Sequence, residues 1–189
     1  MRDIVVSRKE ENGGATLSFG FKSISQLIDP DDPSPFPGTE LTELAEETIF
    51  GYMDEYRVKK PVSLVISLPA AEIPADGSRL IPEAIRRHFA FHIQDVRHDL
   101  VLSRREGIYS LVIAIGNALV AILFLYLATS SGRSLESFPV LLLGGFITVL
   151  NWVTIWDTYE HFVYDYRDLL RKRRLYEKIS RISIAVEEY

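Results

Sequence analysis

The chain has no cysteine among its 189 residues. Disulfide bonds, thiolate-bound metals and a cysteine nucleophile are therefore excluded. The sequence also lacks a glycine-rich phosphate-binding loop and the Gly-x-Ser-x-Gly pattern of a nucleophile elbow. With no catalytic signature left, the sequence predicts a protein that is not an enzyme and uses no cofactor.

The N-terminus has no long apolar run, so "MRDIVVSRKEENGG" is not a secretory signal peptide. Any insertion into a membrane must be directed from within the chain. Within residues 1–80, acidic side chains outnumber basic ones by 14 to 8. This acidic balance argues against nucleic acid as a partner.

Two long stretches carry no charge, residues 107–132 and 137–156. Each contains the roughly 20 mostly apolar residues that a helix needs to cross a bilayer. We expect spans at 109–129 and 138–156, joined by "SSGRSLES", a connection short enough to give an antiparallel hairpin. The alternative, two buried helices of a soluble core, is disfavoured because uncharged runs of this length are rare outside membranes.

Lysine and arginine near the ends of the spans predict the orientation. Few basic residues lie in the connection, where only Arg133 is found. The flanking basic residues are Arg97, Arg104, Arg105, Arg167, Arg171, Lys172, Arg173 and Arg174. We therefore expect a two-span protein of the inner (plasma) membrane with both termini in the cytoplasm.

The chain then leaves the predicted membrane through an aromatic and basic segment. Trp152, Trp156 and Tyr159 share one helical face, as is typical of residues at a membrane interface. A basic cluster follows and is expected to contact anionic lipid headgroups. It consists of Arg171, Lys172, Arg173 and Arg174.

Polar residues are rare inside the two spans. Asn117 and Asn151 lie at comparable depths of an antiparallel pair, so a hydrogen bond between them is expected, within one chain or between two. Lining of a pore is the alternative for these amides. Gly144 and Gly145 would allow another helix to approach closely.

The first 80 residues predict a small α+β domain. An Asn-Gly turn in "ENGG" between two alternating segments indicates a β-hairpin. Residues 39–56 follow a helical pattern, and "PVSLVISLP" indicates a short buried strand. The C-terminal "SRISIAVEEY" alternates like a strand, which could add to the hairpin sheet of its own subunit or to that of the next one.

A long helix is expected to connect this domain to the first span. Its apolar stripe comprises Ile81, Ile85, Phe89, Val96 and Leu100. Gly107 is its only weak point. Because so long a helix extends beyond a small domain, we expect part of the stripe to pack on a neighbouring copy.

The resulting organisation has four parts. Residues 1–80 form a cytoplasmic α+β domain, and residues 81–108 form the helix that leads into the membrane. Residues 109–156 form the transmembrane hairpin. Residues 157–189 form a basic, aromatic interfacial helix and a C-terminal strand.

One group of residues has the chemistry of a metal site. His88, His92, Asp95 and Asp99 recur on one helical face, with His98 beside them, and imidazole with carboxylate can bind zinc. The other interpretation is a solvated polar face that pairs with nearby arginines or a neighbouring subunit. The sequence favours the second interpretation, and no metal site is predicted.

The segments "DPSPFP" and "FVYDYRDLLRKRRLYEKIS" stand on either side of a helix that enters a two-span hairpin. In this combination the chain resembles an uncharacterised family of prokaryotic membrane proteins. The resemblance implies two spans and a cytoplasmic α+β domain. It implies no activity and no catalytic residues.

These features favour a non-enzymatic, membrane-anchored protein that self-associates, as a scaffold or as an accessory subunit of a membrane assembly. Its expected partners are anionic lipid, further copies of itself and another membrane protein. The alternative is a small homo-oligomeric channel or mechanosensitive-type pore. The absence of charge in the spans argues against that alternative.

Overall fold

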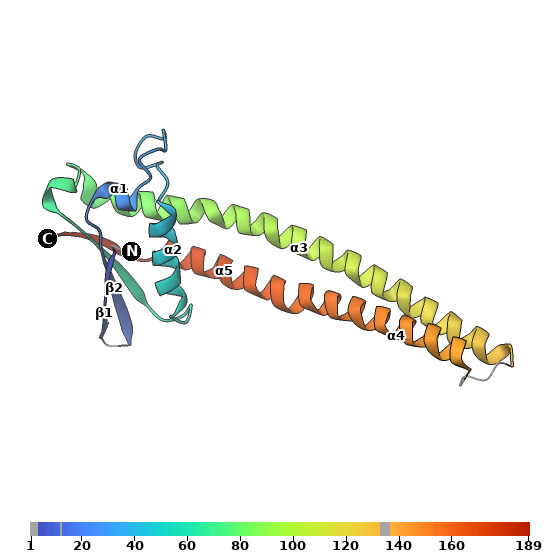
Figure 1. Cartoon of the computed structure of the whole chain (residues 1–189). Coiled ribbons are helices and arrows are strands. Elements are labelled where there is room, and N and C mark those ends of the chain that lie inside the picture. Colours follow the sequence, from blue (N-terminus) through green and yellow to red (C-terminus); the bar gives the residue numbers. More distant parts are fainter. Residues whose placement is uncertain (1–3, 12, 133–136) are drawn as a thin grey trace. The chain divides into compact units, whose positions relative to one another are not determined.

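The computed structural model describes residues 4–11, 13–132 and 137–189. They form two compact units (Figure 1). The first unit comprises Met1–Val96 and Arg171–Tyr189, and the second comprises Arg97–Leu170. The second unit is therefore an insertion in the sequence of the first.

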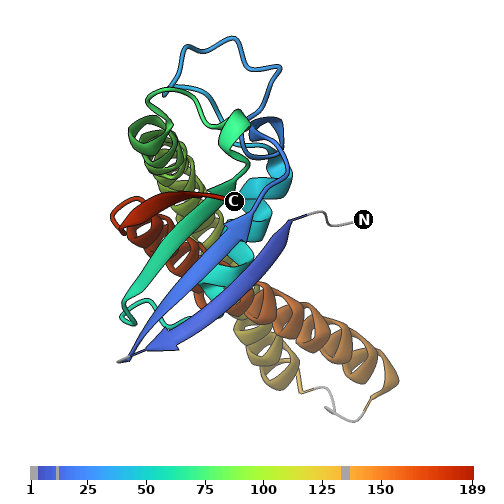
Figure 2. The ribbon, with the colours of Figure 1, turned by 90° about the vertical axis from the view of Figure 1, so that its left-hand side faces the viewer.

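A four-stranded mixed sheet forms the first unit's framework (Figure 2). Its order is β1 (Val5–Glu11), β2 (Gly14–Gly20), β3 (Val62–Leu68) and β4 (Ile184–Glu188). Strands β1 and β2 are antiparallel, whereas β2–β3 and β3–β4 are parallel. The α+β class is thus confirmed.

The predicted hairpin is confirmed. Glu11 lies opposite Gly14, so the two strands pair as far as the predicted turn. Gly13 has φ of +79°, a left-handed conformation that glycine adopts without steric cost. Asn12, the other turn residue of the prediction, lies outside the described residues.

Three short elements connect the strands of the first unit. They are α1 (Ile24–Leu27), α2 (Glu43–Asp54) and the 3₁₀ turn η1 (Ala70–Glu72). Helix α2 is shorter than the predicted 39–56 because Thr42 caps it, its hydroxyl accepting a hydrogen bond from the Ala45 N–H at 3.2 Å. Leu41 instead forms an isolated bridge with Ile28.

The core of the first unit lies between one face of the sheet and three helices (Figure 2). These helices are α2, the start of α3 (Gly77–Ser130) and the end of α5 (Tyr166–Ile179). Strands β2 and β3 bury alternate side chains, as strands with one covered face do. The core side chains with no exposed surface include Leu17, Phe19, Ile49, Leu64, Ile66, Ile85, Phe89 and Ile179.

The apolar stripe of α3 corrects one expectation. Ile81, Ile85, Phe89, Val96 and Leu100 are all buried within this chain, with at most 8% exposed. The stripe is therefore not available to pack on a neighbouring copy. The five side chains are therefore not exposed as the prediction required, because a helical pattern shows an apolar face but does not show which parts of the same chain cover it. Self-association through other residues stays a prediction.

The C-terminal strand also has a definite place. Strand β4 joins the sheet of its own chain that contains the hairpin, the first of the two predicted alternatives, by pairing with β3. The Leu64 N–H donates to the Ser183 carbonyl at 3.0 Å. Strands β3 and β4 are parallel, so they need a crossover connection. Here the connection begins with α3, passes through the second unit and returns along α5.

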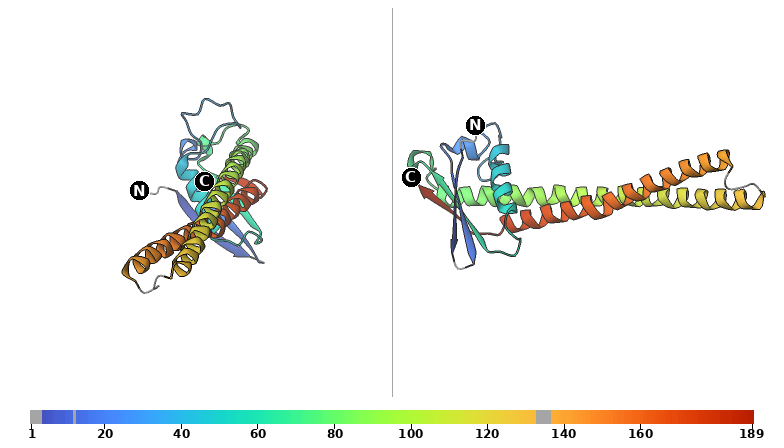
Figure 3. Two further views of the ribbon diagram at one scale, coloured as in Figure 1. Left: turned by 90° about the vertical axis from the view of Figure 1, so that its right-hand side faces the viewer. Right: turned by 60° about the horizontal axis from the view of Figure 1, so that its bottom comes forward.

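The second unit contains two long helices side by side (Figure 3). Helix α3 runs without a break past Gly107, as predicted, although it begins before Ile81 and contains Pro82 near its start. Helix α4 (Phe138–Tyr159) continues through the π-helical η2 (Glu160–Asp165) into α5. Both helices are long and apolar enough to cross a membrane.

Gly107 has a packing role that its sequence did not indicate. A Cβ atom at this position would lie 3.1 Å from the ring of Phe162, which belongs to η2. Such a contact is closer than neighbouring atoms accommodate without movement. The glycine therefore allows the Phe162 ring to lie directly against the α3 backbone.

We expect Gly107→Leu to destabilise the second unit by about 1 to 3 kcal/mol through overpacking. Gly116→Leu is the matched control, since a Cβ there meets nothing within 4 Å. Both changes raise helix propensity equally, so the comparison isolates packing. Thermal unfolding in detergent measures the difference, and equal melting temperatures would contradict this account.

Candidate functional site

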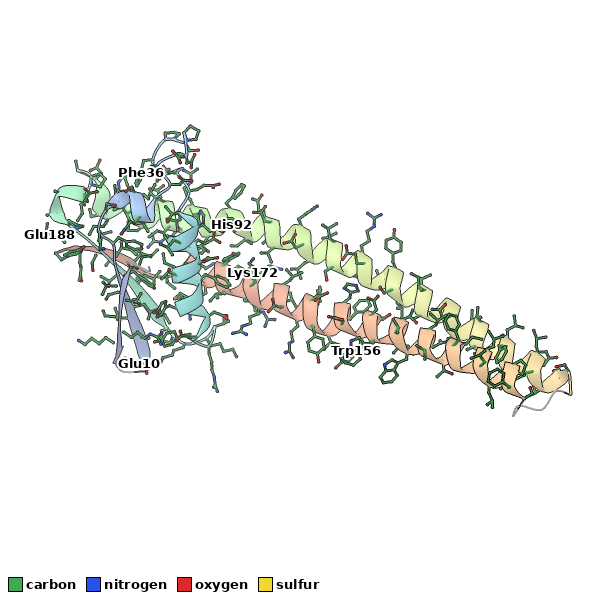
Figure 4. The ribbon with its side chains drawn as sticks, viewed as in Figure 1. Glu10, Phe36, His92, Trp156, Lys172 and Glu188 are labelled. Atoms are coloured by element: carbon green, nitrogen blue, oxygen red, sulfur yellow. The ribbon has the colours of Figure 1, made fainter. Side chains whose placement is uncertain are left out.

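The candidate site lies in the first unit, where polar side chains from three helices meet. Glu46 comes from α2, His88 and His92 come from α3, and Tyr176 comes from α5. Single ligand atoms of Glu46, His88 and His92 lie within 4.8 Å of one another. Figure 4 labels His92 on α3, next to α2.

The His88 side chain is almost fully buried, with 3% of its surface exposed. The backbone N–H of Leu41 donates to its Nδ1 at 3.3 Å. Nε2 lies 3.3 Å from Glu46 Oε2. The ring is not aimed at that oxygen, however, and Nε2 has no aligned hydrogen-bond partner among the described residues.

His92 is more accessible and contacts two carboxylates. Its Nε2 lies 3.8 Å from Glu46 Oε2, and its Nδ1 lies 3.3 Å from Asp95 Oδ2. One helical turn separates His92 from His88, so both rings lie on the same side of α3, with centroids 4.6 Å apart. Glu46 Oε2 is thus the atom that both imidazoles approach.

Tyr176 closes the cluster from α5. Its hydroxyl donates to Glu46 Oε1 at 3.1 Å. Its ring lies among those of Phe50, Phe89 and His92, with centroids 5.2 to 5.9 Å away. Burial, and then the charge of Glu46, raise the pKa of the Tyr176 hydroxyl, so it remains a donor at neutral pH.

The Glu46 carboxylate is stabilised in its charged form. The His88 imidazole against it is the main reason that the pKa of Glu46 lies below its ordinary value of 4.5. Partial burial opposes this effect, while the charge of His92 and the Tyr176 hydroxyl add to it. The cluster therefore presents an ionised carboxylate to two imidazoles.

The structure brings together only part of the predicted metal-like group. His88 and His92 meet, and Asp95 contacts His92, whereas His98 and Asp99 are exposed. Glu46 was missed. It is distant in the sequence, and only the packing of α2 on α3 brings it to the histidines.

The four residues of the predicted basic cluster belong to the first unit. Arg171 lies 2.8 Å from Asp54 Oδ2, and Arg173 lies 2.8 Å from Glu177 Oε1. Lys172 lies on α5 (Figure 4), and its ammonium is 5.7 Å from the centre of the Tyr176 ring. Arg174 is exposed. The predicted contact of these residues with headgroups stays a prediction.

The two asparagines of the apolar helices do meet within one chain. Asn151 Nδ2 donates to the Asn117 carbonyl at 3.3 Å, and Asn117 Nδ2 lies 3.4 Å from the Thr154 hydroxyl. Gly144 faces the ring of Phe124, and Gly145 faces open space. The amides therefore join α3 to α4.

The predicted interface aromatics are exposed on α4. Trp156 lies on α4 (Figure 4). Trp152 is 69% exposed and Trp156 is 53% exposed, and the Trp156 and Tyr159 rings lie 6.1 Å apart. Nearby, Ser110 donates to Asp157 Oδ2 at 2.5 Å. Charged groups therefore begin again just beyond the second apolar run.

No protein-family model matches the chain, and no curated protein or solved structure matches it. The resemblance to a two-span prokaryotic family therefore stays a prediction. The function has to be argued from the residues themselves.

The lowered pKa of Glu46 predicts a pH dependence of stability. A carboxyl group whose pKa falls on folding contributes stability above pH 4.5, and this contribution is lost as the pH falls below that value. We expect Glu46→Gln to remove this part of the acid destabilisation. Melting temperatures in detergent between about pH 7 and 3.5 measure it.

Glu47→Gln is the control for this prediction, because Glu47 is the exposed neighbour of Glu46 on α2. That variant should lose stability on acidification as the wild type does. If Glu46→Gln and wild type show the same acid dependence, the role of the Glu46 carboxylate is refuted.

Proposed function

We propose that the protein is a non-enzymatic membrane anchor that crosses the inner membrane twice and carries its α+β domain in the cytoplasm. There it serves as an accessory subunit or scaffold of a membrane assembly. One observation carries the proposal. In the most apolar 18-residue stretch of α3, only 11% is buried. In the corresponding stretch of the continuous α4–α5 helix, none is buried.

That exposure is costly in water. Large apolar side chains such as Leu119, Ile122, Leu142 and Phe146 are each more than half exposed. Soluble proteins rarely expose so large a continuous apolar surface. The core helix of a soluble protein would bury these side chains, so a bilayer is the environment that fits them.

The orientation rests on the basic residues that flank the apolar runs. Arg133, the single basic residue of the connection, lies outside the described residues. With the more numerous lysines and arginines on the cytoplasmic side, both termini and the sheet would lie in the cytoplasm.

The absence of cysteine allows a direct test. Ser78→Cys places a thiol at an exposed position in the first turn of α3, and Ser131→Cys places one beside the connection. In intact cells, a membrane-impermeant thiol reagent should label Ser131→Cys but not Ser78→Cys, and both should resist carbonate extraction. Release by carbonate, or labelling of both from one side, would overturn the proposal.

Self-association has lost its main argument, because the α3 stripe is buried in the chain itself. Native mass spectrometry in detergent separates the two forms of the proposal. A single copy with a different protein supports an accessory subunit, and a defined homo-oligomer supports a scaffold. A pore is less favoured, since Asn117, Asn151 and Thr154 bond within the helix pair; conductance after reconstitution would reverse this ranking.

A further inference from the structure

We propose that Glu46, His88 and His92 bind one divalent transition-metal ion of the Zn²⁺ type, and that the ion displaces the Leu41 hydrogen bond to His88. The proposal is independent of membrane anchoring. It concerns a site wholly inside the first unit.

The distances from the Glu46 carboxylate to the two imidazoles are close to those around a shared ion, and all three donor atoms lie within 4.8 Å of one another. In tetrahedral zinc sites, bonds of about 2.0 to 2.2 Å place neighbouring ligand atoms roughly 3.3 to 3.5 Å apart. Here Glu46 Oε2 lies 3.3 Å from His88 Nε2 and 3.8 Å from His92 Nε2. The two histidines one helical turn apart and a carboxylate from the facing helix form such a set with little movement.

The buried Nε2 of His88 is the second, independent observation. A polar atom that is removed from water without a hydrogen bond costs free energy. The His88 side chain is 97% buried, and its Nε2 has no aligned partner among the described residues despite its proximity to Glu46. Such a close but misaligned pair is expected of two ligands that both point at a common ion and not at each other.

The neighbouring groups support two of the three ligands. Asp95 Oδ2 lies 3.3 Å from His92 Nδ1, and a carboxylate at that nitrogen keeps Nε2 free to coordinate. Tyr176 donates to Glu46 Oε1, which leaves Oε2, the oxygen nearer both histidines, for the ion.

At His88, in contrast, the hydrogen bond from Leu41 opposes coordination. Binding of the ion and this hydrogen bond are therefore coupled. A neutral imidazole carries one ring proton. While Leu41 N–H donates to Nδ1, that proton is on Nε2. Coordination through Nε2 moves the proton to Nδ1, where it faces the Leu41 N–H, so two donors meet and the hydrogen bond is lost.

The lost bond holds the end of a proline-rich loop. Leu41 follows residues 29–40, and the Asp32 carboxylate accepts from the Glu40 N–H at 2.7 Å within that loop. Leu41 N–H to His88 joins the end of the loop to α3. Ion binding would therefore remove the bond that joins this end of the loop to α3, while the Leu41 bridge to Ile28 remains, and a hydrogen bond that resists displacement would lower the affinity for the ion.

Metal uptake by the full chain in detergent, stripped with a chelator, tests the site. Titration with Zn²⁺ should give one ion per chain, and Co²⁺ should give the visible absorption of tetrahedral coordination. Glu46→Gln and His92→Gln should each weaken binding by about 10-fold or more, and Asp95→Asn should do so by a similar factor. His98→Gln is the matched control, an exposed histidine on the same helix, and should bind as wild type does.

Circular dichroism confirms that each variant is folded, and Glu46→Gln keeps an oxygen for the Tyr176 hydroxyl. Less than stoichiometric uptake by the wild type would overturn the site. Unchanged affinity in both Glu46→Gln and His92→Gln would also overturn it.

The coupling has its own readout in the Leu41 amide, observed by NMR after ¹⁵N-leucine labelling. Saturating Zn²⁺ should speed its hydrogen exchange at least several-fold while leaving the Leu64 amide, which donates to Ser183 within the sheet, protected. Protection of Leu41 that persists with one Zn²⁺ bound would refute the displacement of this hydrogen bond.

Discussion

Tyr176→Ala is expected to destabilise the first unit by about 3 to 5 kcal/mol, the usual cost of removing a large buried aromatic side chain. Tyr176 is 4% exposed and joins the three helices at one point. Its ring contacts those of Phe50 and Phe89, and its hydroxyl holds Glu46. Chemical or thermal unfolding of the full chain in detergent, followed by circular dichroism, measures the loss.

Tyr176→Phe separates the hydroxyl from the ring. It removes only the hydrogen bond to Glu46, a bond to a charged group that is typically worth about 1.5 to 3 kcal/mol. Tyr164→Ala is the control, since Tyr164 is 51% exposed and such surface changes usually stay within about 0.5 kcal/mol. A loss for Tyr176→Ala no larger than that of the control would show that the ring does not hold the helices together.

Local patterns in the sequence predicted most of the secondary structure. The alternation around "ENGG" gave the hairpin, and the uncharged runs gave the apolar parts of α3 and α4. These features depend on neighbours a few residues apart, which is the range over which turn chemistry and helical periodicity act. The end of α2 at Asp54 and the start of α3 at Gly77 depend on capping and packing, so they were placed less accurately.

Local patterns did not predict which elements cover each apolar face. Part of the α3 stripe was expected to pack on a neighbouring copy, yet its five named side chains are buried within the chain itself. An amphipathic pattern defines the face but gives no information about its partner. The long insertion between β3 and β4 also made the partner of the last strand hard to predict, because β4 lies more than 110 residues after β3 in the sequence.

The candidate site shows the same division. Spacing along α3 correctly placed His88 and His92 on one side of the helix, because residues four apart share a face. The same rule also selected Asp99, which is exposed. Glu46, Tyr176 and the Leu41 N–H come from other elements, and only tertiary packing brings them to the histidines.

Ending the chain at Ser180 is the second change for which we expect a large effect. Removal of β4 eliminates Ile184, which is 8% exposed, and losing one such buried side chain typically costs about 2 to 5 kcal/mol. It also removes the Ser183 carbonyl that Leu64 uses and exposes the edge of β3. The truncated chain should therefore melt at a lower temperature and aggregate more readily.

A chain that ends at Glu188 is the control for this truncation. It keeps β4 and loses only Tyr189, whose hydroxyl donates to the Phe21 carbonyl and whose N–H donates to Leu68. Its loss of stability should be smaller, about 1 to 3 kcal/mol for two hydrogen bonds.

Since β4 pairs with β3 of the same chain, the wild-type melting temperature should not change with protein concentration. A strand exchanged between copies would instead make the melting temperature rise with concentration. A wild-type melting temperature for the chain ending at Ser180 would contradict the stabilising role of β4, and a concentration-dependent wild-type transition would contradict its pairing within the chain.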